Sequence, residues 1–208
     1  MAETFRRPSR SLSGMVAIVS GAGAAGDGIG NGRASAILLA EAGCNVVCVD
    51  LQEDLAERTA QMITDSPNHG RALALTADAT KEDQVKAVVD KTVSEFGRLD
   101  ILVNVVGVGG AQGTAEEVDM AAWAKGMEIN VGSCVVMAKY CLPVMARNEG
   151  ERRERGWAGS VVNLASVAGI RGGTPHLLYP TSKGAIVVSA FRFKVVRLAL
   201  TFTHADKR

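Results

Sequence analysis

The residues whose types and spacing best suit chemistry are Tyr179 and Lys183. Residues four apart on a helix share one face and lie about one turn from each other. Tyrosine is a poor base because its unperturbed pKa is about 10, but an ammonium about 4 Å away attracts the phenolate by about 4 kcal/mol at an effective dielectric of about 20. At about 1.36 kcal/mol per pKa unit, this attraction is large enough to favour proton transfer near neutral pH. The pair therefore predicts a general acid/base.

Ser166 is the third candidate for a catalytic role. It follows the apolar run 159–165, which predicts a buried strand. Its hydroxyl would lie at the carboxyl end of that strand, the edge at which open α/β sheets carry their chemistry. Each candidate also has a simpler interpretation, because serine is common in turns and the Tyr-x-x-x-Lys spacing arises by chance. The surrounding sequence decides between these interpretations.

Strand and helix patterns alternate along the chain. The strand patterns cover residues 15–19, 44–50, 71–77, 99–106 and 159–165, and the helical patterns cover 33–43, 53–64, 81–96, 118–147 and the stretch around Tyr179. This alternation predicts an α/β fold, a Rossmann-type doubly wound parallel sheet between two helical layers. We expect one domain over residues 14–208, preceded by a flexible tail over residues 1–13.

Composition is that of an ordinary globular protein. The chain has 208 residues, of which 47% are apolar and 22% charged, and its net charge of +1 predicts no nucleic-acid or membrane partner. The cysteines and the three histidines have no metal-ligand spacing, so we expect no metal and reduced, mostly buried thiols in a cytoplasmic protein. The cysteines are Cys44, Cys48, Cys134 and Cys141.

A glycine-rich loop follows the first strand pattern, over residues 20–32. Glycines at a first strand–helix turn let backbone N–H groups and a helix N-terminus approach a pyrophosphate. The simpler alternative is a plain connection. We expect a dinucleotide to contact this loop at Gly21, Gly28, Ile29 and Gly30.

Asp50 ends the second strand pattern, twenty residues after Gly30. A carboxylate in this position can accept a hydrogen bond from an adenosine ribose hydroxyl. It would repel a 2′-phosphate, and Leu51 and Gln52 offer no cation to bind one. The sequence therefore favours NAD over NADP.

Together these motifs resemble the classical short-chain dehydrogenases/reductases, over about residues 14–188. Ser20 stands for the threonine of the family motif T-G-x-x-x-G-x-G, with extra residues after Gly21. Both Gly28-Ile29-Gly30 and Gly30-Asn31-Gly32 fit the last two glycine positions, and the sequence does not decide between them.

The resemblance implies further cofactor contacts. Asp78, followed by Ala79, matches the family aspartate that meets the adenine. Asn104 and Gly107 match the first and last residues of the family's N-N-A-G motif, whose middle is altered here.

The resemblance also completes a catalytic tetrad. Asn130 matches the family's helix asparagine, and Ser166, Tyr179 and Lys183 match the other three members. It implies an NAD-dependent oxidoreductase that interconverts a small-molecule secondary alcohol and a ketone. Tyr179 would be the acid/base, Lys183 would also hold the nicotinamide ribose, Ser166 would bond the substrate oxygen, and Asn130 would hold a water.

The resemblance stops near residue 188. The stretch 189–202 shows partial period-two alternation, and we expect the chain to lack the family's usual last strands and the pocket wall that they support. The alternative is therefore a truncated, non-catalytic dinucleotide-binding fragment or pseudoenzyme. A third possibility is a structural subunit that needs a full-length partner. The helix at 118–147 and the Tyr179 helix resemble those through which the family forms a homodimer.

Overall fold

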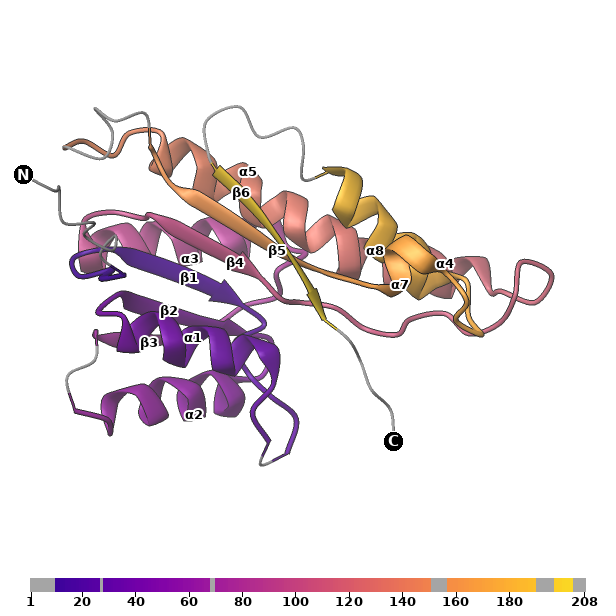
Figure 1. Cartoon of the computed structure of the whole chain (residues 1–208), viewed down its shortest axis with the longest axis horizontal. Coiled ribbons are helices and arrows are strands. Elements are labelled where there is room, and N and C mark those ends of the chain that lie inside the picture. The colour runs from indigo at the N-terminus through magenta and orange to yellow at the C-terminus, as the bar shows by residue number, and fades with distance from the viewer. Residues whose placement is uncertain (1–9, 27, 68–69, 151–156, 190–196, 204–208) are drawn as a thin grey trace, which may run out of the picture.

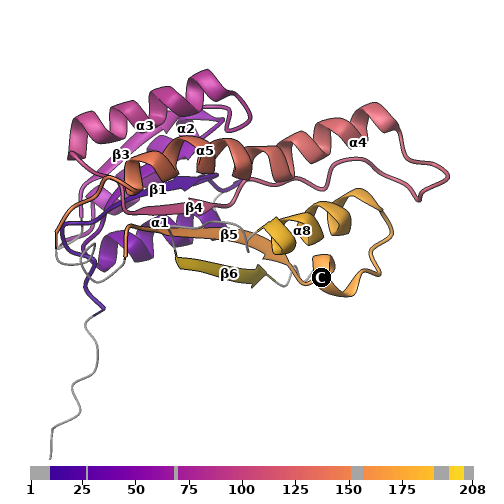
Figure 2. The same ribbon diagram turned by 90° about the horizontal axis from the view of Figure 1, so that it is seen from above.

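Six parallel strands form one sheet with helices on both faces. A computed structural model describes residues 10–26, 28–67, 70–150, 157–189 and 197–203. The strand order is β3-β2-β1-β4-β5-β6, and Figures 1 and 2 show the three layers. The predicted fold class, a Rossmann-type doubly wound α/β domain, is confirmed.

Most elements agree with the sequence patterns to within a few residues. The strands are β1 (Val16–Ser20), β2 (Asn45–Asp50), β3 (Ala72–Thr76), β4 (Ile101–Asn104), β5 (Ser160–Ser166) and β6 (Arg197–Thr203). The helices are α1 (Asn31–Glu41), α2 (Glu53–Thr64), α3 (Glu82–Phe96), α4 (Met120–Met127), η1 (Glu128–Gly132), α5 (Ser133–Met145), α7 (Ala168–Arg171) and α8 (Leu178–Ser189).

The core has one apolar layer on each face of the sheet. Ala17 and Val19 of β1 pack toward α1, and Ile18, which points the other way, packs toward α3 and α5. Because both faces are covered, all five residues of β1 are buried, as expected for a parallel strand with a continuous apolar run. All four cysteines are buried, as the sequence analysis predicts, and none is bonded to another.

The helix predicted over 118–147 contains an irregularity. Its first part, α4, is capped by Asp119, whose side chain accepts a hydrogen bond from Ala122 N at 2.7 Å. The next five residues, around Asn130, form the π-helical turn η1, after which α5 continues. A π-turn interrupts the 3.6-residue period and often marks a functional position.

A sixth strand corrects part of the expectation that the chain lacks the family's usual last strands. β6 pairs in parallel with β5 from Ser160↔Arg197 to Ser166↔Thr203. The open edge of β5 offers unpaired N–H and C=O groups, and the period-two alternation of the tail suits a strand that satisfies them. The carboxyl end of β5, where Ser166 lies, is therefore inside the sheet and not at its edge.

Two predicted segments fall largely outside the described residues. Of the predicted tail 1–13, residues 1–9 are not described, whereas Leu12 N donates to Ala42 O at 2.7 Å. Of the charged stretch 149–155, whose Glu and Arg residues predict a solvated connection, residues 151–155 are not described either. In the described chain, none of the helices has the length and apolarity that crossing a bilayer requires.

Candidate active site

Polar side chains stand at the carboxyl ends of β1 and β4 and at the position of β5 that pairs with them. Ser20, Asn104 and Asn163 are register partners across β1, β4 and β5. Asn104 Nδ2 donates to Asn163 Oδ1 at 2.8 Å, but Ser20 Oγ and Asn104 Oδ1 are buried without a partner among the described residues. Unpaired buried polar atoms are unusual, and these lie on β1 and β4, between which the strand order reverses, the place where such folds bind ligands. This edge therefore fits a polar ligand.

Helix α8 carries Tyr179 and Lys183 to the same edge. Lys183 Nζ lies 5.8 Å from the centroid of the Tyr179 ring and donates to Leu164 O at 2.8 Å. Only 4% of Lys183 is exposed, and this burial lowers its pKa below the usual value of 10.5. The single carbonyl bond leaves two N–H groups of the ammonium for other partners.

The placement of α8 depends on small residues and on a proline. Pro180 lies in the first turn, where its missing N–H costs no helical hydrogen bond. Gly169 of α7 lies so close to α8 that a Cβ there would be 2.5 Å from Gly184 N. Ser166, buried just before α7, accepts a hydrogen bond from Ala168 N at 3.2 Å. The turn after β5 thus fixes both Ser166 and the helix of Lys183.

Asn130 connects the π-turn to two other segments. Its Oδ1 accepts from Val108 N at 2.8 Å, and its Nδ2 donates to Val108 O and Ser182 Oγ, each at 2.9 Å. Both amide hydrogens are used inside the protein. A water held by Asn130 would therefore bind to Oδ1 or to the backbone carbonyl.

A cavity of about 150 Å³ joins these parts. Its lining residues are Asn31, Val105, Gly107, Leu164, Ala165, Tyr179 and Lys183. A Cβ at Gly107 would lie 3.2 Å from Lys183 Nζ, so glycine keeps this side of the cavity open. Among the described residues, Ser166 does not line it. The cavity therefore unites three of the sequence-predicted residues, Gly107, Tyr179 and Lys183, and adds Asn31, which the sequence analysis did not select.

The glycine-rich loop has tight and open positions. Gly21 has φ +76°, which glycine tolerates best, and a Cβ at Gly32 would overlap with the Gly21 carbonyl oxygen. A Cβ at Gly28 would meet nothing within 4 Å, and the neighbouring Ile29 is exposed. Close helix–strand packing is the role of the third motif glycine, and Gly32 fits it. With Gly30 as the N-cap of α1, this geometry favours Gly30-Asn31-Gly32.

Asp50 supports the glycine loop from the end of β2. Its Oδ2 accepts from Gly23 N at 2.8 Å and its Oδ1 from Gln52 N at 3.1 Å. A carboxylate oxygen has more than one acceptor position, so both oxygens can still accept a further hydrogen bond.

Asp78 lies after β3 in a local turn. Partial burial favours its neutral form, but hydrogen bonds from Thr80 N and Oγ and the charges of Lys81 and Lys125 outweigh this and lower its pKa. Ala79, beside it, is buried in the core layer that contacts α3. Asp78 is thus an ionised acceptor, and Ala79 a packing residue.

Arg33 is a residue whose position the sequence patterns did not reveal. It is fully buried, and its guanidinium donates to Gly28 O at 2.6 Å and to Thr59 Oγ1 at 3.1 Å. Thr59 Oγ1 in turn donates a hydrogen bond to Ala22 O at 2.9 Å. These bonds tie α1 and α2 to both ends of the extended glycine loop. The arginine directly after the last motif glycine was the available signal.

Comparisons with known proteins show what this chain is similar to. A family model described as enoyl-(acyl carrier protein) reductase matches residues 23–193. Cis-4-hydroxycyclohexanecarboxylate dehydrogenase of Sinomonas cyclohexanicum is 33% identical over 171 residues, 82% of this chain and 62% of its own length. NAD-dependent glycerol dehydrogenase of Listeria innocua is 33% identical over 177 residues, 85% of this chain and 62% of its own.

A solved structure extends the similarity to the fold. A candidate short-chain dehydrogenase/reductase from Burkholderia xenovorans superposes with a TM-score of 0.80 at 34% identity, over 94% of this chain and 77% of that one. The chain spans 62 to 64% of the length of three curated relatives that it matches.

We expect Gly32→Ala to destabilise the fold although alanine normally favours a helix. The added methyl group would overlap with the Gly21 carbonyl, and such overpacking typically costs about 1–3 kcal/mol. Gly28→Ala is the matched control and should change the free energy of unfolding by less than about 0.5 kcal/mol. Urea unfolding measures the free energy of unfolding of both variants. Equal values for Gly32→Ala and Gly28→Ala would show that Gly32 does not fill the tight position.

We expect the stability of Lys183→Met, relative to the original chain, to fall as pH rises. Because burial lowers the pKa of Lys183 in the folded state, keeping its ammonium there costs folding stability. This cost disappears as pH rises from the folded-state pKa toward 10.5, so the stability of the original chain rises over that range. The methionine variant carries no such penalty at any pH. Unfolding free energies of both proteins between pH 7 and pH 10.5 test this, and a constant difference would contradict a desolvated ammonium at this position.

Proposed function

The chain belongs to the classical short-chain dehydrogenase/reductase family, and on this premise we propose that it is an NAD-dependent oxidoreductase that interconverts a secondary alcohol and a ketone. The observation that carries the proposal is the cavity at the carboxyl edge of the sheet, which Tyr179, Lys183 and Gly107 line together. Ser20 Oγ and Asn104 Oδ1, at the same edge of the sheet, are buried without a partner in the described chain, which supports a bound dinucleotide.

Tyr179 moves the proton in the proposed reaction. A bound nicotinamide dinucleotide would supply the hydride acceptor for the alcohol, or the hydride donor for the ketone. The Tyr179 phenolic oxygen would take the hydroxyl proton during oxidation and return it to the carbonyl oxygen during reduction. The ammonium of Lys183, 5.8 Å from the centroid of the Tyr179 ring, would accompany Tyr179 in this step, and its two remaining N–H groups can bond to the ribose.

Ser166 and Asn130 have supporting roles. Ser166 can donate its hydroxyl hydrogen to the substrate oxygen while its oxygen accepts from Ala168 N, which orients that hydroxyl. Asn130 holds Val108 and Ser182, so it fixes the loop after β4 relative to the helix of Tyr179.

Asp50 and its neighbours support NAD as the cofactor. The Asp50 carboxylate, held by Gly23 N and Gln52 N, suits a ribose hydroxyl and repels a 2′-phosphate. Leu51, the next residue, is 67% exposed and brings no positive charge. The name of the glycerol dehydrogenase relative specifies NAD as well. Asp78 would meet the adenine.

The substrate we propose is a small alcohol or ketone. The names of two relatives specify glycerol and a hydroxycyclohexanecarboxylate, both of which carry secondary hydroxyl groups. We also propose a homodimer through the helices α4–α5 and α8. These helices expose apolar side chains, among them Met120, Val135 and Val188, that a second copy would cover.

A second candidate is a dinucleotide-binding protein without turnover. The position of Ser166 favours it, because Ser166 is 2% exposed and does not line the cavity in the described chain. Calorimetric titration with NAD, followed by assays with a panel of secondary alcohols, separates the two. Binding with NADH formation supports the oxidoreductase, and binding without it supports the second candidate.

We expect Tyr179→Phe to lower turnover about 100- to 10,000-fold, the usual contribution of a general acid/base, with little change in NAD affinity. The control is Tyr140→Phe, because Tyr140, the other tyrosine of the chain, bonds to Glu82 on the surface. Steady-state kinetics and calorimetry measure the two effects. Near-normal turnover in Tyr179→Phe would remove this residue from the mechanism.

We expect Asp50→Ala combined with Leu51→Arg to shift preference toward NADP by about tenfold or more, equivalent to about 1.4 kcal/mol of differential binding. The change removes a repelling carboxylate, adds a phosphate partner, and leaves Gly23 N–H free to donate. Leu51→Arg alone, which retains the carboxylate, is the control. The measurement is the ratio of the dissociation constants for NAD and NADP, and an unchanged ratio would place Asp50 away from the ribose.

A further inference from the structure

We propose that Leu178 is a positioning residue for Tyr179, and that its side chain does this by filling a space that Gly110 and Gly126 leave open. Leu178 directly precedes Tyr179 at the start of α8 and is fully buried. The role that we assign to it rests on the proposed function of Tyr179.

The two glycines contact Leu178 from different elements. A Cβ at Gly126, in α4, would lie 2.5 Å from Leu178 Cδ1, and a Cβ at Gly110, in the loop after β4, would overlap with Leu178 Cδ2. Gly110 also has φ +70°, a conformation that suits glycine. Leu178 therefore joins α8, α4 and this loop. α4 and α8 lie side by side in the part of the molecule that projects beyond the sheet (Figures 1 and 2).

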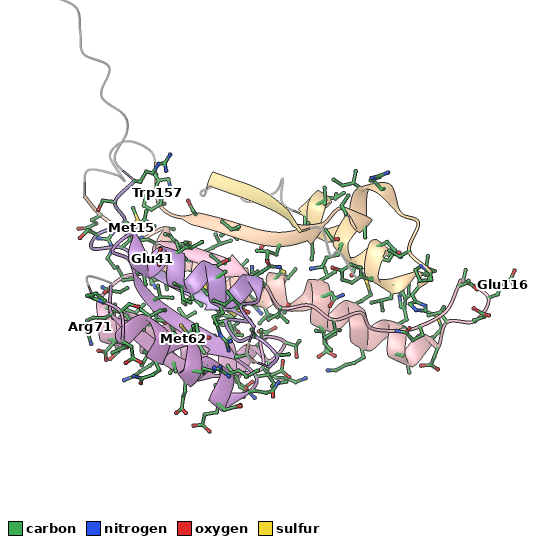
Figure 3. The ribbon with its side chains drawn as sticks, turned by 60° about the horizontal axis from the view of Figure 1, so that its bottom comes forward. Met15, Glu41, Met62, Arg71, Glu116 and Trp157 are labelled. Atoms are coloured by element: carbon green, nitrogen blue, oxygen red, sulfur yellow. The ribbon has the colours of Figure 1, made fainter. Side chains whose placement is uncertain are left out.

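Hydrogen bonds hold the same loop against the segment before Tyr179. Gly113 N donates to His176 Nδ1 at 3.0 Å, and Leu177 N donates to Gly113 O at 3.1 Å. The loop then continues to Glu116, at the tip of the projecting part and opposite to Met15 and Trp157 (Figure 3). The loop after β4, α4 and the start of α8 are thus packed together, and Leu178 contacts all three.

The Tyr179 phenol depends on this packing. Among the described residues, no hydrogen bond holds its hydroxyl, and Lys183 Nζ lies 5.8 Å from the ring centroid. The position of the Tyr179 ring therefore follows from the backbone at the start of α8, which the packing of Leu178 holds in place. A displacement of about 1 Å at a reacting group can lower a rate about 100-fold.

The test is Gly126→Ala, which places a methyl group against Leu178 Cδ1. We expect turnover to fall about 100-fold with NAD affinity within about threefold of the original, because the displacement acts on Tyr179 and not on the glycine loop. Gly132→Ala is the control on the same long helix, since its Cβ would have only ordinary contacts at 3.9 Å or more. Adding Leu178→Val to Gly126→Ala removes the Cδ atoms, and the double variant should turn over at least tenfold faster than Gly126→Ala alone.

A second measurement needs no activity. The chain has two tyrosines, so ¹³C-tyrosine labelling gives two sets of ring resonances, which Tyr140→Phe assigns. We expect Gly126→Ala to shift the Tyr179 resonances and not those of Tyr140, and Leu178→Val to reverse the shift. Unshifted Tyr179 resonances in folded Gly126→Ala, or no reversal by Leu178→Val, would overturn the proposal. If the original chain shows no turnover, the proposed function fails, while the resonances still decide the role of Leu178.

Discussion

The site depends on the hydrogen bonds of one buried asparagine. Asn130 has its two amide hydrogens and its oxygen bonded to Val108 and Ser182. Leaving any of these buried groups unpaired is costly, so the loop after β4, the π-turn and α8 keep one relative arrangement. An uninterrupted α-helix would place the side chain differently along this face, and the π-turn is the local irregularity that accommodates it. The position of Lys183, next to Ser182, follows from the same network.

Burial of the Lys183 ammonium is the second constraint. An ammonium loses solvation when it is buried, and this one keeps a single carbonyl bond, to Leu164 O. Close packing of Gly169 against the backbone of Lys183 and Gly184 fixes the start of this side chain, and the absence of a Cβ at Gly107 keeps the cavity open beside its Nζ. The fold therefore holds a buried ammonium in a fixed place, at a cost in stability, with its Nζ 5.8 Å from the centroid of the Tyr179 ring.

Periodicity predicted the sheet, the helices and the position of Ser166 at a strand end, because burial on both faces leaves a strong apolar signal in short strands. It could not predict features that depend on backbone geometry. The π-turn keeps a helical composition, so the sequence reads as one helix there. β6 forms where the neighbouring edge of β5 is open, so a tertiary contact completes a period-two pattern that is too weak on its own to predict a strand. The buried place of Arg33 and the fit of Leu178 likewise depend on contacts between distant segments.

The length of the glycine loop follows from the same kind of contact. Extra residues between Gly21 and Gly30 would normally increase the conformational entropy that a binding loop loses. Arg33 opposes this, since its guanidinium holds the carbonyl of Gly28 and, through Thr59, the start of the loop at Ala22. Among the described residues no carboxylate pairs with this buried cation, so backbone carbonyls and a hydroxyl supply its solvation. A longer loop can therefore stay ordered for a ligand without a change elsewhere in the fold.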